Sequence, residues 1–247
     1  MRLFLALPAY NEAESLPHLF AAFEREVVAR DVPARVVVVD DGSTDATMDV
    51  VKEWSGRLDI QALRHRGNCG LGTTIRDALW MAAKSAEPAD VIVTMDADNT
   101  HSPALILTML ERLQAGHDIV IASRYRTGAG VVGLSPLRLF MSTGARFLFQ
   151  TMYPIPGVRD YTCGFRAYRA GLIQRGFEKF GDSLITETGF ACMAEVLLKL
   201  TKLDARMCEV PMVLRYDHKR GTSKMRVWRT VNRTVRLLLR ARFERWH

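Results

Sequence analysis

Two carboxylates, Asp96 and Asp98, stand two residues apart directly after a short apolar run. Carboxylates this close repel each other unless a cation or hydrogen-bond donors compensate their charge. A small set of oxygen ligands suits Mg²⁺ or Mn²⁺, which also bind the oxygens of substrate phosphates. Such a metal could neutralise the charge that develops on a departing nucleoside diphosphate. Capping of a following helix by Asn99 or Ser102 is the simpler interpretation, but it does not explain both aspartates.

Unusual polar residues also follow three other apolar runs, in Pro8-Ala9-Tyr10-Asn11-Glu12, Asp40–Asp45 and Ser123-Arg124-Tyr125. In open α/β sheets, ligands bind outside the carboxyl ends of the strands, so we expect these segments to meet at one edge of a sheet. Taken alone, the second segment is better explained as a turn in which Ser43 or Asp45 caps the next helix, and the first could be an ordinary helix start. The glycine-rich phosphate fingerprint does not follow the first run, which counts against a Rossmann dehydrogenase.

The elements that must position these residues alternate regularly through the first half of the chain. Apolar runs predict strands at Leu3–Leu7, Val36–Val39, Ile60–Leu63, Val91–Met95 and Ile119–Ala122. Amphipathic periodicity predicts helices at Ala13–Arg30, Asp45–Ser55, Leu71–Lys84 and Pro103–Ala115. This alternation indicates an α/β fold with a mostly parallel, Rossmann-like sheet and helices on both faces. The near-continuous apolar strands indicate a sheet that is buried on both sides.

After about Arg124 the alternation stops. Gly128, Gly130 and Gly133 predict a flexible loop. Periodicity then predicts helices at Leu137–Met152 and Glu187–Leu200, a strand at Met207–Tyr216 and a last amphipathic helix at Met225–Trp246. We therefore expect one domain over residues 1–224, followed by a basic C-terminal helix over residues 225–247.

Length and cysteine use narrow the class of protein further. A chain of 247 residues fits one large domain. The four cysteines are widely spaced and include no Cys-x-x-Cys pair, a pattern that fits neither a zinc site nor a disulfide framework, and a reducing cytoplasmic setting is the simpler interpretation. The N-terminal apolar run is too short for a signal peptide, and nothing approaches the ~18 apolar residues of a membrane span. We expect a protein that is soluble or peripheral to a membrane.

The motifs together resemble a known family. Those of the N-terminal half are Pro8–Glu12, Val39-Asp40-Asp41-Gly42-Ser43, Gly70-Leu71-Gly72, Met95–Asp98 and Ser123-Arg124-Tyr125, and they resemble the inverting family 2 glycosyltransferases of GT-A fold. Later motifs resemble the branch of dolichol-phosphate mannose synthases and related polyprenyl-phosphate glycosyltransferases; they are Asp160–Arg166, Glu209-Val210-Pro211 and Gly221-Thr222-Ser223-Lys224. The resemblance spans about residues 3–224, in the expected order.

The resemblance implies roles for single residues. Five of them would hold the nucleoside: Pro8, Tyr10, Glu12, Val39 and Asp41. Asp96, Ala97 and Asp98 would touch the diphosphate, with Asp96 and Asp98 as ligands of Mg²⁺ or Mn²⁺. Arg124 and Lys224 would neutralise phosphate charge during catalysis. Arg138 and Ser142 match positions thought to receive the acceptor phosphate, although on spacing alone they could belong to a plain surface helix.

Two positions depart from the family pattern. His218 stands where an arginine would contact the diphosphate, six residues before Lys224, and Lys219 or Arg220 could supply the missing charge. Thr100 stands where some relatives provide a third metal ligand from a glutamine. A hydroxyl is a weaker ligand, and water could take its place.

The reaction that the resemblance implies is inverting transfer of a sugar from a nucleoside diphosphate, with mannose from GDP-mannose as the expected donor and a polyprenyl or dolichyl phosphate as the acceptor. A phosphate monoester with a second pKa near 6 is largely dianionic at pH 7, so it needs no general base. A soluble sugar or small-molecule acceptor is the alternative, and its hydroxyl would need a base. Glu187 and Glu195 are candidates for that base, although Glu195 fits a helix surface acid better.

The tail carries much of the net charge of +7, with seven arginines and one acid from Met225 onward. Its arginines and its apolar residues recur at helical spacing on opposite faces, which suits an interfacial helix on anionic lipid. The apolar face could equally pack on the protein's own core or on a second copy in a homo-oligomer. We expect a cytoplasmic protein, peripheral on the inner face of the cytoplasmic membrane in the lipid case. A nucleic-acid-binding role for the tail is disfavoured, because it leaves Asp96, Asp98 and Glu12 unexplained.

Overall fold

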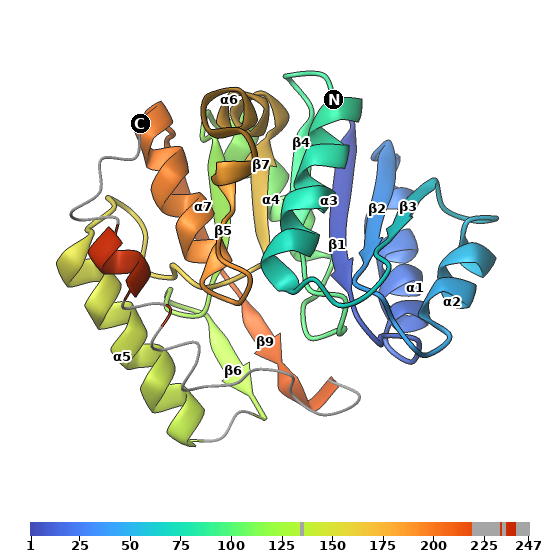
Figure 1. Ribbon diagram of the computed structural model, residues 1–247, viewed down its shortest axis with the longest axis horizontal. Helices are drawn as coiled ribbons and strands as arrows, with labels where there is room; N and C mark the ends of the chain where they lie inside the picture. The colour runs from blue at the N-terminus through green and yellow to red at the C-terminus, as the bar shows by residue number, and fades with distance from the viewer. Residues whose placement is uncertain (134–135, 219–232, 234–235, 241–247) are drawn as a thin grey trace.

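The computed structural model describes residues 1–133, 136–218, 233 and 236–240 (Figure 1). Within these residues, seven strands form one sheet in the order β3-β2-β1-β4-β7-β5-β8, and the short strands β6 and β9 pair in a second sheet. Helices cover both faces of the main sheet (Figure 1). The predicted α/β architecture with a mostly parallel sheet is confirmed.

Parallel pairing joins the first four strands of the main sheet, which are β1 (Leu3–Ala9), β2 (Ala34–Asp40), β3 (Ile60–Arg64) and β4 (Val91–Thr94). β1 and β4 are central, and their apolar side chains are buried. Because parallel strands end at the same edge, the loops that follow β1, β2 and β4 lie next to one another, as the sequence predicted.

The helices of this half begin and end close to the predicted residues. α1 (Leu16–Glu26) and α2 (Thr47–Trp54) lie on one face of the sheet, and α3 (Leu71–Ser85) lies on the other (Figure 1). The predicted segment 13–30 is longer than α1. Its last residues, Val28–Arg30, form a 3₁₀ turn that ends at Asp31, which has a positive φ of 57°.

One strand of the main sheet runs against the others. β7 (Arg166–Arg169) lies between β4 and β5 (Ile119–Ser123) and is antiparallel to both, while β8 (Met207–Pro211) pairs parallel with β5 at the edge. α4 (Leu105–Gln114) packs against β5 and β7, and α6 (Ala170–Phe180) packs against α3. The sequence analysis predicted neither β7 nor α6. β7 shows no apolar run, because it has only four residues and two of them are arginines.

The prediction of a single strand over residues 207–216 was wrong. β8 ends at Pro211, and β9 (Val213–Arg215) pairs with β6 (Gly130–Val132) in the second sheet. Proline has no backbone N–H with which to continue a ladder. Met212 links the sheets instead: its N–H donates to the Ser123 carbonyl (3.0 Å), and its carbonyl accepts from the Gly130 N–H (3.1 Å). The glycine-rich loop predicted at residues 128–133 therefore contains a strand.

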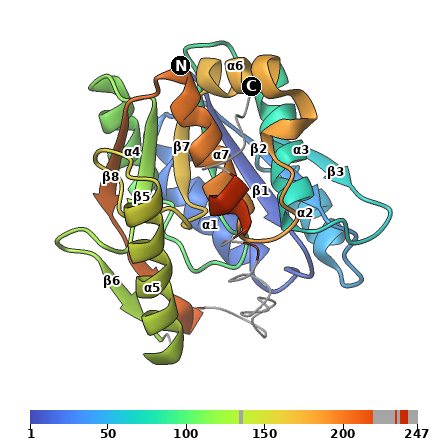
Figure 2. The ribbon, with the colours of Figure 1, turned by 60° about the vertical axis from the view of Figure 1, so that its left-hand side comes forward.

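Two further helices belong to the second half. α5 (Pro136–Met152) confirms the helix predicted from Leu137, and it lies beside β6, apart from the centre of the main sheet (Figures 1 and 2). α7 (Cys192–Leu200) is shorter than the predicted helix from Glu187, because residues 186–188 make hydrogen bonds to side chains and to α3 instead of helical ones.

Of the tail, the structure describes only Arg233 and residues 236–240, which are helical. Leu237 and Leu238 are fully buried against the protein core, while Arg236 and Arg240 are exposed. This short stretch thus matches the alternative in which the tail packs on its own protein. The rest of the predicted helix over residues 225–246 lies outside the described residues. Among the helices that the structure describes, none is both long and apolar enough to cross a membrane.

Candidate active site

The loops that follow β1 and β2 are bonded into one unit. The Asn11 N–H donates to Ser43 Oγ (2.8 Å), and the Thr44 N–H donates to Asn11 Oδ1 (2.8 Å). The Glu12 N–H donates to Thr47 Oγ1 (2.9 Å). Asn11 has a positive φ of 52°, a conformation that asparagine tolerates better than most residues. The unit fixes the backbone around Tyr10 and Glu12 against the start of α2.

Capping explains part of the second motif. Asp45 accepts the N–H groups of Thr47, the first residue of α2 (3.0 Å), and of Ala13 (3.1 Å). Burial alone would raise the pKa of Asp45, but these hydrogen bonds outweigh it and lower the pKa. Ser43 caps no helix, because its N–H and hydroxyl donate to the fully buried Asp40, which also lies 3.2 Å from Arg64 Nε.

Asp41 is not explained by a turn. Its side chain is buried, and both oxygens face the N-terminus of α3: Oδ1 accepts the Cys69 N–H (2.8 Å) and Oδ2 accepts the Gly70 N–H (2.9 Å). A helix N-terminus stabilises a carboxylate through its unpaired N–H groups and its dipole. The nucleoside residue expected from the resemblance is therefore held rigidly at this edge.

His65, at the end of β3, is a site residue that the sequence analysis missed. Its Nδ1 lies 2.9 Å from Asp41 Oδ1 and its Nε2 lies 3.0 Å from Asp77 Oδ2. Burial alone would lower the pKa of His65, but the two aspartates outweigh it and raise the pKa. A single histidine after a short strand gives no sequence signal, because Asp41 and Asp77 approach it only through the fold.

The motif Gly70-Leu71-Gly72 allows a loop to lie directly on the start of α3. A Cβ at Gly70, where φ is +92°, would lie 2.7 Å from the Thr188 carbonyl oxygen, and a Cβ at Gly72 would overlap the Glu187 carbonyl oxygen. The Gly72 N–H donates to the Thr188 carbonyl (3.2 Å). These glycines bring Glu187 to the same edge as Asp41.

The Asp96 and Asp98 pair follows β4 at the same edge. Asp98 is 8% exposed, and its Oδ1 accepts the Thr100 N–H (3.2 Å) and hydroxyl (2.6 Å). Thr100 thus orients Asp98. A Cβ at Gly164 would lie only 3.1 Å from Asp96 Oδ1, so the glycine leaves room for that carboxylate. Two carboxylates at the end of one strand, one of them oriented by Thr100, are ligands that suit Mg²⁺ or Mn²⁺.

Arg124 is committed to another side chain. Its Nε and one terminal nitrogen donate to the two oxygens of Asp160 (2.8 and 2.7 Å), and the same terminal nitrogen reaches Thr162 Oγ1 (2.8 Å). Burial alone would lower the pKa of Arg124, but Asp160 outweighs it and raises the pKa; Arg124 in turn lowers the pKa of Asp160. The geometry therefore makes Arg124 a brace of the loop before β7.

Residues of the later motifs make further contacts that fix the same loop before β7. Glu209 accepts the N–H groups of Arg159 and Asp160, both at 2.6 Å, and lies 2.8 Å from Arg126 Nε. Arg166 is fully buried, and its guanidinium donates to the carbonyls of Tyr161 (2.7 Å) and Met193 (2.6 Å). The segment that carries Gly164 past Asp96 is thereby held on both sides.

The two candidate bases have different surroundings. Glu195 is buried and accepts from the Thr186 N–H and hydroxyl, the Glu187 N–H and Lys199 Nζ, at 2.6–2.8 Å. The interpretation of Glu195 as a surface acid was therefore wrong, and its hydrogen bonds assign it to bracing the loop. Glu187 is partly buried; burial raises its pKa and nearby Glu195 raises it further, against Arg233 and Arg240.

The remaining predicted site residues divide into two groups. Pro8 and Val39 pair across β1 and β2 at the carboxyl edge, and Ala97 is buried between Asp96 and Asp98. Arg138 and Ser142 lie in α5, and His218 ends a 3₁₀ turn after β9, but the side chains of all three lie outside the described structure. Lys224 lies outside the described residues altogether. The sites of these last four residues stay predictions.

The fold is an α/β fold whose candidate site residues lie at the carboxyl ends of its parallel strands. A family model described as "Glycosyl transferase family 2" matches residues 5–177. The chain therefore belongs to glycosyl transferase family 2.

Curated relatives and solved structures agree with this family. A dolichol-phosphate mannosyltransferase from Pyrococcus furiosus is 30% identical over 92% of this chain, and this chain spans 60% of that protein. An undecaprenyl-phosphate mannosyltransferase from Micrococcus luteus is 30% identical over 91% of this chain and 88% of that protein. A Mycobacterium tuberculosis glucosyl-3-phosphoglycerate synthase, solved with Mn²⁺ and UDP-glucose, matches with a TM-score of 0.67 at 20% identity, covering 98% of this chain and 79% of that one. The last match shows the GT-A fold.

Proposed function

We propose that this protein transfers a sugar from a nucleoside diphosphate to a polyprenyl phosphate, with inversion and with the help of a divalent metal. One observation carries the proposal: Asp98, oriented by Thr100, and Asp96, facing Gly164, follow β4 at the edge where Asp41 is held by α3. The acceptor is inferred from the relatives, whose names specify dolichol phosphate and undecaprenyl phosphate. Those names also make mannose the sugar that we propose, and GDP-mannose is the donor that the sequence resemblance implies.

The donor would lie across the edge formed by the first, second and fourth strands. Pro8, Tyr10, Glu12, Val39 and Asp41 hold its nucleoside. Asp96 and Asp98 hold the metal, which supplies positive charge to the leaving diphosphate. Lys224 and His218 add charge from the segment after β9. Because such charges are fixed before the reaction, they stabilise the transition state more than water would.

The acceptor phosphate is its own nucleophile in this scheme. A dianionic phosphate oxygen attacks the anomeric carbon, and no protein group has to remove a proton. This agrees with Glu195, whose carboxylate is already surrounded by four donor groups. Arg138 and Ser142, one turn apart on α5, bind the acceptor phosphate. The enzyme then works in the cytoplasm at the inner face of the membrane that holds its acceptor.

A soluble acceptor is the second candidate, and Glu187 is the observation in its favour. The raised pKa of this carboxyl is what a general base near neutral pH requires, and its loop lies on the start of α3. A glucosyl-3-phosphoglycerate synthase is among the solved structures of similar fold, although its 20% identity says nothing about this chain's acceptor.

Transfer of radiolabel from a panel of GDP- and UDP-sugars would test both candidates. Each donor is incubated with polyprenyl phosphate, or with small sugars and phosphorylated acids, in the presence of Mg²⁺ or Mn²⁺ and again after chelation by EDTA. Metal-dependent label in the lipid fraction is the expected result. Label in a water-soluble product alone would favour the soluble acceptor over the polyprenyl phosphate. Donor binding without any product would contradict both acceptors.

A further inference from the structure

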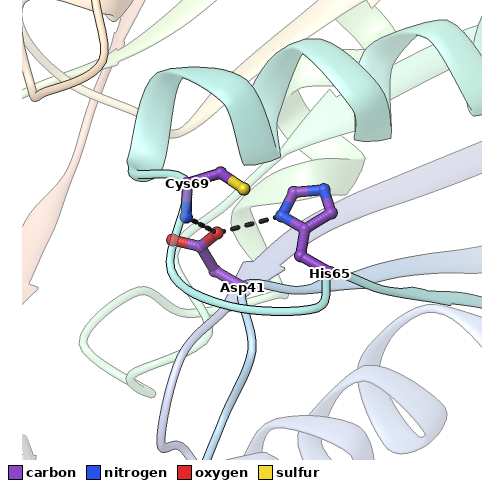
Figure 3. Close-up of side chains that lie close together, drawn as sticks. All are labelled: Asp41, His65 and Cys69. Carbon is purple, nitrogen blue, oxygen red and sulfur yellow. Dashed lines mark hydrogen bonds and ion pairs between the residues drawn. The ribbon is translucent and has the colours of Figure 1, made fainter.

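Three side chains from two loops, the one after β2 and the one between β3 and α3, meet outside the acidic pair. Asp41 follows β2, His65 follows β3, and Cys69 precedes α3 (Figure 3). Each offers one ligand atom, and the three atoms lie within 4.8 Å of one another. Asp41 is buried, His65 is nearly so, and Cys69 is exposed, so the cluster is open to solvent on the side of the thiol.

The spacing suits a small tetrahedral ion. Zinc bonds of about 2.0–2.1 Å to nitrogen and oxygen place two ligand atoms of a tetrahedral site about 3.3 Å apart. His65 Nδ1 and Asp41 Oδ1 are now 2.9 Å apart, so a movement of a few tenths of an ångström would admit the ion between them. The exposed Cys69 thiol, which now donates to the Gly67 carbonyl (3.4 Å), would leave that partner to become the third ligand, and water would be the fourth.

The surroundings of the cluster also resemble a metal centre. A metal-bound histidine usually donates its other ring N–H to a carboxylate, which fixes the ring and strengthens the ligand. His65 Nε2 lies 3.0 Å from Asp77 Oδ2, and Arg76 Nε holds the other oxygen of Asp77 (3.0 Å). Asp41 is fixed in turn by the N–H groups of Cys69 and Gly70. Two of the three ligands are therefore already oriented by partners of their own.

We propose that Asp41, His65 and Cys69 form a binding site for zinc, distinct from the magnesium or manganese site at Asp96 and Asp98, and that zinc bound there weakens binding of the donor nucleoside. Thiolate and imidazole ligands select zinc over magnesium, whereas the all-oxygen pair does not. On binding, the Cys69 thiol proton and the His65 Nδ1 proton leave to solvent, and the ion takes the place of the proton between His65 and Asp41. The effect on the donor rests on the proposed function, but zinc binding itself does not.

Metal titration of the purified full chain tests the binding. Co²⁺, a spectroscopic stand-in for zinc, is expected to give the ultraviolet band of a cobalt–thiolate bond, and Zn²⁺ to displace it. The band should disappear in Cys69→Ser and persist in the matched control Cys208→Ser, whose thiol lies outside the cluster. Asp98→Asn should keep the band, and Asp77→Asn should bind zinc about 10–100-fold more weakly. Equal zinc affinity of the wild type and Cys69→Ser would overturn the site.

His65→Gln removes a second ligand, and a melting curve shows whether that variant is folded. If it is unfolded, Cys69→Ser and Asp77→Asn still decide whether the zinc site exists.

The effect of zinc on donor binding is tested separately. The donor KM is measured at fixed Mg²⁺ with and without Zn²⁺. The donor KM with Zn²⁺, divided by the donor KM without Zn²⁺, should be severalfold above one in the wild type and near one in Cys69→Ser. A wild-type ratio near one, with zinc bound, would contradict the competition. Absence of all sugar transfer would count against the proposed function. The metal titration would then still test zinc binding, because it does not depend on activity.

Discussion

The two sides of the candidate site are held together by different forces. On the side where we propose that the nucleoside binds, the loops after β1, β2 and β3 are joined mainly by backbone N–H groups that donate to side chains, as at Asn11, Asp41 and Asp45. On the other side, the loops after β5 and before β7 and the strand β8 are joined by ion pairs whose carboxylates are fully buried, Arg124 with Asp160 and Arg126 with Glu209. Loss of one acceptor of the first kind leaves backbone donors unsatisfied and costs about 1–3 kcal/mol. The second leaves an uncompensated buried charge, so we expect single substitutions there to cost more stability.

The largest expected effect concerns activity alone. Asp98→Asn removes a charge from the proposed metal pair, and we expect transfer to fall by about 10²–10³-fold, the range typical for loss of one fixed electrostatic contact in a transition state. The measurement is the initial rate of sugar transfer at saturating metal. Asp49→Asn, an exposed acid on α2, is the matched control and should retain the wild-type rate. A near-normal rate for Asp98→Asn would remove the metal role from this residue.

The largest expected effect on stability lies on the charged side. Asp160→Asn leaves Arg124 buried without its counter-ion, and we expect the free energy of unfolding to fall by about 3–5 kcal/mol in urea denaturation. The double variant Asp160→Asn with Arg124→Met removes both charges. Its loss in free energy of unfolding should be smaller than the sum of the losses in the two single variants, because each single change already destroys the same interaction. Additive losses would mean that the pair is not the unit that holds this loop.

A steric prediction of intermediate size tests the loop on α3. Gly72→Ala places a methyl group against the Glu187 carbonyl, and overpacking of this kind typically costs about 1–3 kcal/mol. Gly67→Ala is the matched control, because a Cβ at that position meets nothing within 4 Å. Thermal unfolding of both variants distinguishes the two environments. Similar melting temperatures would show that residues 187–188 can move away from the helix.

The smallest prediction is a dependence on pH on the nucleoside side. The pKa of Asp45 is lower in the folded protein than its ordinary value of 3.8, so its carboxylate contributes stability above that value and loses the contribution as pH falls through the folded pKa. The difference in unfolding free energy between the wild type and Asp45→Asn should therefore be constant near neutral pH and shrink in acid. A difference that grows in acid would have the wrong sign for this mechanism.

The same contrast explains what the sequence could predict. Five strands and four helices of the N-terminal half follow from apolar runs and helical periodicity, because each βα unit carries its own pattern. β7 shows no such pattern, since its burial comes from β4 and β5, which lie far away in the chain. The sequence analysis placed one strand over residues 207–216, and only the hydrogen bonds of Met212 show that the chain passes from one sheet to the other there.

The candidate site divides in a similar way. Asp41, Asp96 and Asp98 could be singled out because each follows an apolar run. The pairing of Arg124 with Asp160, and of Glu195 with the 186–187 loop, could not, because nothing local marks which charges will be buried together. His65 is the clearest omission, for its partners come from β2 and α3.

The antiparallel strand β7 has a consequence for the order in which the protein is made. The chain emerges from the ribosome with β4 and β5 complete more than forty residues before β7 exists to bridge them, so the sheet stays divided between these two strands until residues 166–169 arrive. Gly164 reaches Asp96 only at that moment. The nucleoside half can therefore take shape during synthesis, whereas the acidic edge acquires its final neighbours late, as a product of long-range closure.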